Sequence, residues 1–148
     1  MTELQLFPAK EPLSSVCIDI LGEFIKTQRR NEYLLVITDR FSKLTKTVPM
    51  KGISAAEVAG HFINSWVFNY GPPEELIADN GGCFTSKFFI DVCRIMSIKN
   101  NFTTTYHPQS NGQVQRYNRT ILAAPRTYVS DHPRDWDLYT DALTYAYN

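Results

Sequence analysis

"SVCIDIL" at residues 15–21 and "YLLVITD" at residues 33–39 are apolar and β-branched nearly throughout. Such runs are typical of central strands that are covered on both faces. "LTKTVPM" at residues 44–50 alternates more clearly and predicts a third strand nearer the sheet edge, where a proline is tolerated. "QRRNE" at residues 28–32 predicts the hairpin connection between the first two strands. We therefore expect three antiparallel strands at the start of the domain.

Helices and strands alternate in the rest of the chain. Ser54 and Glu57 have capping-box spacing, and the apolar pattern after them predicts a helix that ends at Gly71. Ser86 is the expected cap of a second helix, and another capping box at Ser110 begins a long third one. After the first helix we expect a strand, a helix, a strand and two helices at residues 74–82, 86–96, 97–103, 110–128 and 135–148. This order predicts an α/β fold in which a mixed five-stranded sheet carries helices on both faces.

The composition is that of one globular domain. The chain has 148 residues and a mass of 17.0 kDa, which suffices for a single core but not for a second full domain. We assign residues 1–12 to an N-terminal lead-in and residues 13–148 to the domain. Because the last predicted helix ends without a cap, we expect the C-terminus to be truncated.

The formal net charge is zero, with 15 Lys plus Arg and 15 Asp plus Glu, which argues against a dedicated electrostatic nucleic-acid binder. The distribution is uneven. Residues 26–51 contain seven basic and two acidic side chains, residues 79–126 contain six and two, and residues 131–148 contain one and four. A neutral chain can therefore still present a basic face, although the same charges can simply solvate loops and helix surfaces.

Sequence signals for zinc and for membranes are absent. The cysteines at positions 17, 83 and 93 are odd in number and widely spaced, without a Cys-x-x-Cys pair or a His pair at zinc-ligand spacing. The chain shows no signal peptide and no apolar run long enough to span a membrane. We expect a soluble, intracellular protein of a reducing compartment, with no zinc and no membrane partner.

Three aspartates occupy chemically informative positions. Asp19 lies mid-strand among apolar residues, so it needs a cation, a network of donors such as backbone or lysine, or an exposed strand edge. Asp79 ends a predicted strand, where α/β sheets usually hold ligands, but it also begins the ordinary turn sequence "DNGG". Asp39 ends its strand beside Arg40 and Lys43, and we expect an ion-paired turn residue there. Two converging carboxylates plus a third would suit a pair of magnesium ions.

Five motifs carry a resemblance to a known family. They are "IDIL" (18–21), "YLLVITDRFSK" (33–43), "GPPEELIADNGGCFTSKFF" (71–89), "YHPQSNGQVQRYNRTI" (106–121) and the closing "DW" (135–136) with "AYN" (146–148). In order and spacing they resemble the catalytic core of integrases from gypsy-type LTR retrotransposons, relatives of retroviral integrases. The resemblance implies a ribonuclease H-like fold. It also implies a triad of two aspartates and one glutamate that binds two magnesium (or manganese) ions and joins the 3′ ends of element DNA to target DNA.

Carried over by position, the resemblance makes Asp19 and Asp79 catalytic metal ligands. It places the third ligand, a glutamate, at position 115, where this chain has Gln115. The exchange costs little helix propensity but removes one negative charge from a site that must neutralise two dications. We expect weakened metal binding and the loss of most turnover. Pro125 is a second departure from the family, and we expect the long helix to kink or end there, since proline in a helix interior costs about 3 kcal/mol.

The resemblance also implies contact with DNA. A polar loop at residues 107–113 and the helix face that follows it would lie along the DNA, and basic side chains would contact phosphates without reading sequence. The expected nucleic-acid-binding residues are Lys43, Lys46, His107, Gln109, Asn111, Gln113, Arg116, Asn118 and Arg119, with Lys87 as a further phosphate contact. For each lysine or arginine, a solvated surface role is the alternative.

More than one function is open at this point. The leading hypothesis is a DNA-binding integrase core that is related to metal-dependent strand transfer, forms a homodimer, acts in the nucleus and is impaired by Gln115. The alternative is a non-enzymatic DNA-tethering or dimerisation module that retains the fold. A ribonuclease H-like nuclease of another family is disfavoured by "YHPQSNGQ" at residues 106–113. The family's zinc-binding and C-terminal domains are not within these 148 residues, so a decayed copy, an inactivated copy and a fragment are all compatible with the sequence.

Overall fold

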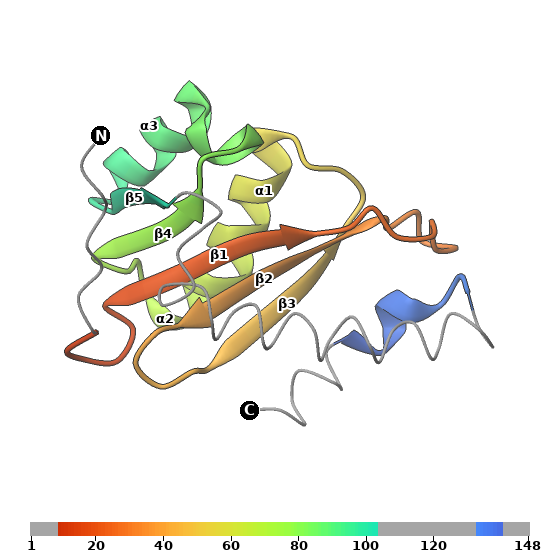
Figure 1. The fold of residues 1–148 in the computed structure, drawn as a ribbon, viewed down its shortest axis with the longest axis horizontal. Coiled ribbons are helices and arrows are strands. Elements are labelled where there is room, and N and C mark those ends of the chain that lie inside the picture. Colours follow the sequence, from red (N-terminus) through yellow and green to blue (C-terminus); the bar gives the residue numbers. More distant parts are fainter. Residues whose placement is uncertain (1–8, 104–132, 141–148) are drawn as a thin grey trace.

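One mixed sheet organises the part of the chain that the structure describes. The computed structural model describes residues 9–103 and 133–140 (Figure 1). Five strands follow the order β3-β2-β1-β4-β5 across the sheet. Their bounds are Ser15–Leu21 for β1, Tyr33–Asp39 for β2, Thr45–Met50 for β3, Glu75–Asp79 for β4 and Lys99–Thr103 for β5. All five predicted strands are confirmed, the first two with the predicted bounds.

β1, β2 and β3 form an antiparallel meander. Asp19 of β1 lies opposite Val36 of β2, which lies opposite Thr47 of β3. The connection between β1 and β2 is longer than the predicted residues 28–32, because it occupies residues 22–32. At its start, Gly22 has a φ of +131°, and a Cβ there would lie 2.8 Å from the carbonyl oxygen of Glu32. A side chain would not fit where the chain leaves β1.

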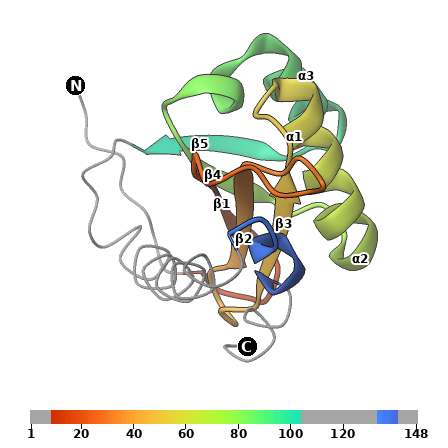
Figure 2. The same cartoon turned by 90° about the vertical axis from the view of Figure 1, so that its right-hand side faces the viewer.

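β4 and β5 extend the sheet in parallel on the other side of β1. Each is reached through a helical crossover, as parallel neighbours require. The crossover helices are α1 (Ala55–Phe62) and α3 (Lys87–Ile95), the second of which follows the 3-10 turn η2 (Gly82–Thr85). Figure 2 shows both helices on the same side of the sheet.

Both crossover helices begin where their caps predict. The Oγ atoms of Ser54 and Ser86 each accept a hydrogen bond from the backbone N–H three residues further on. The first helix differs from the single α-helix that the sequence predicts. It continues through the π-helical turn η1 (Ile63–Val67) into the short α2 (Phe68–Tyr70), and the chain then turns away at Gly71, with a φ of +86°.

The main core fills the space between these helices and one face of the sheet. Phe62 and Trp66 from the first helix and Phe89 from the second are at most 1% exposed. They belong to one cluster with Val16 and Ile18 of β1 and with the inward residues of the other strands. This burial of large apolar side chains is the main stabilisation of the fold.

The opposite face of the sheet carries a smaller apolar cluster. Trp136, which is 1% exposed, packs there with Leu34 and Val36. The residue begins the 3-10 turn η3 (Trp136–Leu138), where the sequence predicted an α-helix from residue 135. Residues 141–148 of that predicted helix and the predicted helix at 110–128 lie outside the described residues. Within the described ranges, no helix is both long and apolar enough to cross a membrane.

Candidate active site

The sheet places the strands of Asp19 and Asp79 side by side. β1 and β4 are parallel neighbours, with Ser15 opposite Glu75 and Cys17 opposite Ile77. The paired part of the two strands ends there, and Asp19 and Asp79 each lie two residues further along, at equivalent positions of their strands. Because the strands run in the same direction, both carboxylates lie near the carboxyl edge of the sheet, where open α/β folds usually bind their ligands.

Alternation along the strands places these aspartates on the face away from α1 and α3. Val16 and Ile18 of β1 belong to the main core, whereas Cys17 forms a separate cluster with Ile77. Successive side chains of a strand point to opposite faces, so Asp19 shares the face of Cys17, and Asp79 shares that of Ile77. The expected pair of carboxylates therefore shares one face of the sheet, opposite the main core.

Each aspartate has a local hydrogen bond that orients its carboxylate. Oδ1 of Asp19 accepts from the backbone N–H of Ile20 at 2.9 Å, and Oδ1 of Asp79 accepts from that of Gly81 at 3.0 Å. Both side chains belong to half-buried residues. Among the described residues, the Oδ2 atom of Asp79 has no hydrogen-bond partner.

These oxygens fit part of a magnesium site. Magnesium prefers oxygen ligands and is commonly bound through one or two carboxylates together with water. Within residues 9–103 and 133–140, no group of three His, Cys, Asp or Glu side chains is placed to hold a metal ion. A third ligand would have to come from elsewhere, and Gln115 lies outside the described residues.

A second polar cluster lies at the opposite end of the same two strands. Glu75 accepts hydrogen bonds from Ser15 Oγ at 3.0 Å and from Asn101 Nδ2 at 2.6 Å. Arg40 donates to Ser15 Oγ at 3.0 Å and approaches the Glu75 carboxylate to 4.0 Å. Cys17 lies on β1 between this cluster and Asp19. Burial raises the pKa of its thiol to about 11, so the side chain is neutral at physiological pH.

Asp39 is a structural residue rather than a metal ligand. It is 0% exposed, and its carboxylate accepts from the backbone N–H groups of Leu13, Phe41 and Ser42 at 3.0 to 3.3 Å and from Ser42 Oγ at 2.6 Å. The predicted turn role is confirmed. The predicted ion pair with its basic neighbours is wrong, because backbone donors satisfy the carboxylate while Arg40 reaches Ser15 instead.

A family model described as the integrase core domain matches residues 9–108 of the chain. The match covers well over half of the sequence and includes both Asp19 and Asp79. The chain belongs to the integrase core domain family. The matched region ends before position 115.

Individual relatives indicate which group of integrases the chain resembles. The chain is 31% identical over 133 residues to the retrovirus-related Pol polyprotein from transposon 412 of Drosophila melanogaster, covering 90% of this chain and 11% of the polyprotein. It is 30% identical over 143 residues to the human gypsy retrotransposon integrase-like protein 1, covering 97% of this chain and 27% of that protein. The chain thus spans about a quarter or less of these relatives. The resemblance to gypsy-type, retroviral-like integrases is confirmed.

Solved structures confirm the ribonuclease H-like fold of the integrase core. A simian T-cell lymphotropic virus intasome in complex with PP2A regulatory subunit B56 gamma superposes with a TM-score of 0.79 at 22% identity, covering 99% of this chain and 52% of that chain. The HTLV-2 integrase catalytic core domain in complex with magnesium, in its dimeric form, gives 0.71 at 24% identity, covering 91% and 86%.

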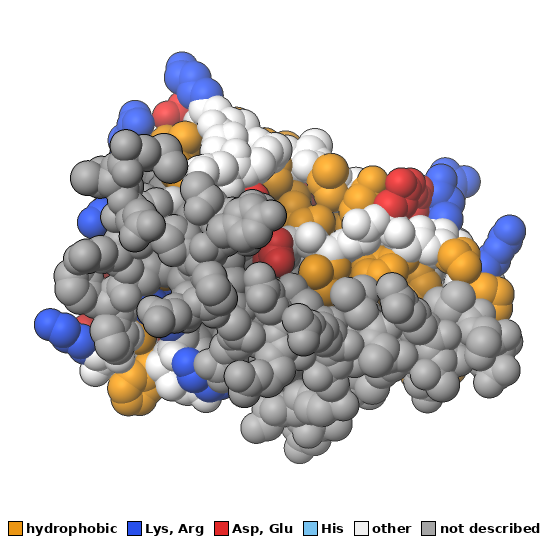
Figure 3. Space-filling view, viewed as in Figure 1, with side chains coloured by type: hydrophobic (Ala, Val, Ile, Leu, Met, Phe, Trp, Pro, Cys, Tyr) orange, Lys and Arg blue, Asp and Glu red, His pale blue; other side chains and the backbone are white. Residues whose placement is uncertain are grey.

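The described nucleic-acid candidates of the integrase core do not gather at the aspartates. Lys43 lies in the β2–β3 turn, at the end of β1 opposite to Asp19, since Arg40 in that turn bonds to the backbone of Ser15. Lys46 pairs with Ile37 and so lies on the sheet face of the main core. Lys87 is exposed at the start of α3. Figure 3 shows lysine and arginine side chains at separate points around this view rather than in one patch.

The other candidates lie outside the described residues, as does Pro125. These candidates are His107, Gln109, Asn111, Gln113, Gln115, Arg116, Asn118 and Arg119.

Sequence reasoning missed two groups of polar residues in the integrase core. Glu75 shares a face with Asp79, and the alternation in "ELIAD" at residues 75–79 was a signal that could have revealed it. The second group joins the β1–β2 connection to residues 134–137, which are far apart in the sequence. No local pattern marks that contact, because only tertiary structure brings the segments together.

Proposed function

We propose that this integrase core binds DNA and descends from an enzyme of metal-dependent DNA strand transfer, with catalysis impaired by Gln115. The observation that carries the proposal is the parallel register of β1 and β4, in which Asp19 and Asp79 each lie two residues beyond the last pair, Cys17 and Ile77. The magnesium bound by the dimeric HTLV-2 core supports a divalent ion as the cofactor. Magnesium or manganese in such a site would activate the attacking oxygen and stabilise the leaving oxygen of a phosphodiester.

The residues of this chain contribute by holding and orienting oxygen ligands. The Oδ1 atom of Asp79 accepts a hydrogen bond from the backbone N–H of Gly81, which orients the carboxylate. Its Oδ2 atom has no partner among the described residues and would be the metal ligand. Asp19 lies on a strand that is covered by neighbours on both sides, which restricts its movement. Gln115, at the position of the third ligand, offers an amide oxygen but no charge, so the site holds one negative charge fewer. We expect weaker metal affinity and little turnover.

The partners of this core follow from the same proposal. Element-end DNA and target DNA are its substrates, and the polar region at 107–119 would lie along the DNA. Lys43 and Lys46 lie away from the two aspartates and would contact phosphates only of a more distant part of the DNA. A homodimer is supported by the dimeric form of the HTLV-2 core. A protein that acts on chromosomal DNA would work in the nucleus.

Restoring the carboxylate tests the catalytic part of the proposal. Gln115→Glu should raise magnesium- or manganese-dependent strand transfer, or disintegration of a branched DNA substrate, by about a hundredfold or more, the size of effect of one preorganised electrostatic contact. The matched control is Gln115→Glu combined with Asp79→Asn, which should return activity to the background. If the folded Gln115→Glu protein gains nothing, Gln115 is not what limits catalysis.

A second candidate function is a DNA-tethering or dimerisation module without enzymatic activity. Gln115 itself favours it, because a chain that only binds DNA has no need of the third carboxylate. This function predicts metal-independent, salt-sensitive DNA binding and a dimer by light scattering. It also predicts no strand-transfer activity in the Gln115→Glu protein, with or without Asp79→Asn. Cleavage of DNA by the unaltered protein that is abolished by Asp79→Asn would contradict it.

A further inference from the structure

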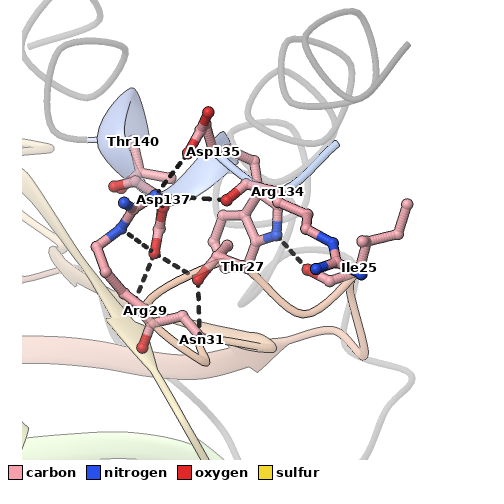
Figure 4. Close-up of polar contacts among 9 residues, drawn as sticks. Ile25, Thr27, Arg29, Asn31, Arg134, Asp135, Asp137 and Thr140 are labelled. Carbon is pink, nitrogen blue, oxygen red and sulfur yellow. Dashed lines mark hydrogen bonds and ion pairs between the residues drawn. The ribbon is translucent and has the colours of Figure 1, made fainter. Parts of the chain in front are cut away.

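Residues 134–137 dock onto the β1–β2 connection through a dense set of hydrogen bonds (Figure 4). The connection projects beyond the sheet as an irregular hairpin loop, in which Phe24 N–H donates to the Glu32 carbonyl at 2.7 Å and Thr27 N–H donates to the Asn31 carbonyl at 3.0 Å. An isolated two-stranded hairpin is only marginally stable in water. Contacts from elsewhere in the chain therefore decide how rigid this hairpin loop is.

Asp137 is the centre of the docking contact. Its Oδ2 atom accepts hydrogen bonds from Thr27 Oγ1 at 2.7 Å, Asn31 Nδ2 at 2.8 Å and Arg29 Nε at 3.0 Å. Its side chain is only 2% exposed, and Arg29 also bonds to its other oxygen and to Asp135. Burial raises the pKa of Asp137, but the bonds donated by Arg29, Thr27 and Asn31 outweigh it and hold the pKa below its ordinary value.

Trp136 carries the apolar half of the same contact. Its indole N–H donates to the carbonyl oxygen of Ile25 at 2.6 Å, and its ring lies 5.0 Å from that of Phe24. The ring packs on Leu34 and Val36, which are 0% and 1% exposed. Hydrogen bonds and apolar burial thus act together on one segment.

The apolar contact is the immediate neighbour of Asp19. Val36 lies opposite Asp19 in the β1–β2 register, and Leu34 lies opposite Leu21. Directly opposed residues of an antiparallel pair share one face of the sheet. Asp19 therefore has the strand of Asp79 as one neighbour and, on the other side, the strand that Trp136 covers.

Charge argues against a DNA contact at this place. The region contains four basic residues and four acidic ones, which are Lys26, Arg29, Arg30 and Arg134 against Glu23, Glu32, Asp135 and Asp137. Attraction to phosphates needs an excess of positive charge. Because Arg29 is ion-paired with Asp135 and Asp137, its charge is already neutralised within the chain. The contact is therefore better suited to holding two segments of the chain together than to binding DNA.

We propose that Trp136 and Asp137 are positioning residues, which brace the carboxyl end of β1 and so fix the place of Asp19 beside Asp79. The proposal rests on the proposed function only in giving Asp19 a metal-binding role. The brace acts through Val36 and through the β1–β2 connection, without contact to the metal.

Amide hydrogen exchange tests the brace without any metal. In the full 148-residue chain, Trp136→Phe and Asp137→Asn should each speed exchange at the β1 amides from Asp19 to Leu21 at least fivefold, and leave Glu75 to Asp79 unchanged. The matched control is Phe89→Leu, a substitution in the core on the other face of the sheet. Exchange rates are compared after allowing for the loss of Tm in each variant. If the amides of Asp19–Leu21 exchange no faster in Trp136→Phe and Asp137→Asn than in Phe89→Leu at an equal loss of Tm, the proposal is overturned.

Manganese affinity tests whether the brace matters to the site. In the Gln115→Glu protein, Trp136→Phe or Asp137→Asn should weaken Mn2+ affinity, measured by electron paramagnetic resonance, by about threefold to tenfold. This effect is smaller than the roughly 10–100-fold loss that follows mutation of a residue bonded directly to a metal ligand. Equal affinity with and without the brace substitutions would overturn the positioning role. If Gln115→Glu protein binds no Mn2+ at all, the proposed function fails at its metal site, while the exchange measurement still decides whether the brace exists.

Discussion

Replacing Asp39 by alanine should destabilise the fold severely, although its sequence neighbourhood marks it only as a charged turn residue. The side chain is 0% exposed and accepts four hydrogen bonds, three of them from backbone N–H groups of Leu13, Phe41 and Ser42. Leu13 lies 26 residues away in the sequence, so the carboxylate ties the start of the domain to the β2–β3 turn. Alanine would leave all four donors without their acceptor.

The size of the effect follows from these contacts. A hydrogen bond to a charged group contributes about 1.5–3 kcal/mol, and contributions within one network are not additive. We therefore expect a loss of about 3–5 kcal/mol of unfolding free energy, which is a large part of the 5–15 kcal/mol that roughly bounds domain stability. For a chain of this length, that corresponds to a Tm lower by about 10 °C or more.

Urea and thermal unfolding followed by circular dichroism would measure the loss. The matched control is Asp91→Ala, which removes an aspartate whose side chain is 41% exposed and whose ion pair with Arg94 spans 3.5 Å. That change should stay within about 0.5 kcal/mol. A loss below about 1 kcal/mol for Asp39→Ala would refute the reasoning, since the buried donors would then have found other acceptors.

Three further predictions concern backbone, pH and thiol chemistry. Gly22→Ala should cost more stability than Gly71→Ala in urea unfolding, because both have positive φ but only the first Cβ would collide, at 2.8 Å. Asp137 has a lowered pKa, so its contribution to stability is present above the unfolded value of about 3.9 and is lost as pH falls through the lower folded value. The stability gap between wild type and Asp137→Asn in urea unfolding should therefore narrow as the pH is lowered below the unfolded value. Burial raises the pKa of Cys17 and Cys93 to about 11, so at pH 8 both thiols should react with iodoacetamide, followed by mass spectrometry, far more slowly in the native than in the urea-unfolded chain.

Much of the fold was predictable because its signals are local. The apolar runs at β1 and β2 and the serine caps of α1 and α3 depend on short stretches of chain, and the structure has them where the sequence places them. The π-helical turn at Ile63–Val67 was not predicted, since its apolar spacing is that of an ordinary α-helix. The 3-10 turn at Trp136–Leu138 was also missed, because its contacts lie more than a hundred residues away.

By itself, the sequence determined the strand and helix segments, the integrase family and the identity of the candidate ligands, including the neutral side chain of Gln115. These properties depend on residue type and spacing along the chain. Only the tertiary structure decided which residues meet: it made the strands of Asp19 and Asp79 parallel neighbours, enclosed Asp39 in backbone donors and docked Trp136 on Val36, the residue opposite Asp19. Strand register and long-range hydrogen bonds fix these neighbours, and neither can be read from any single stretch of sequence.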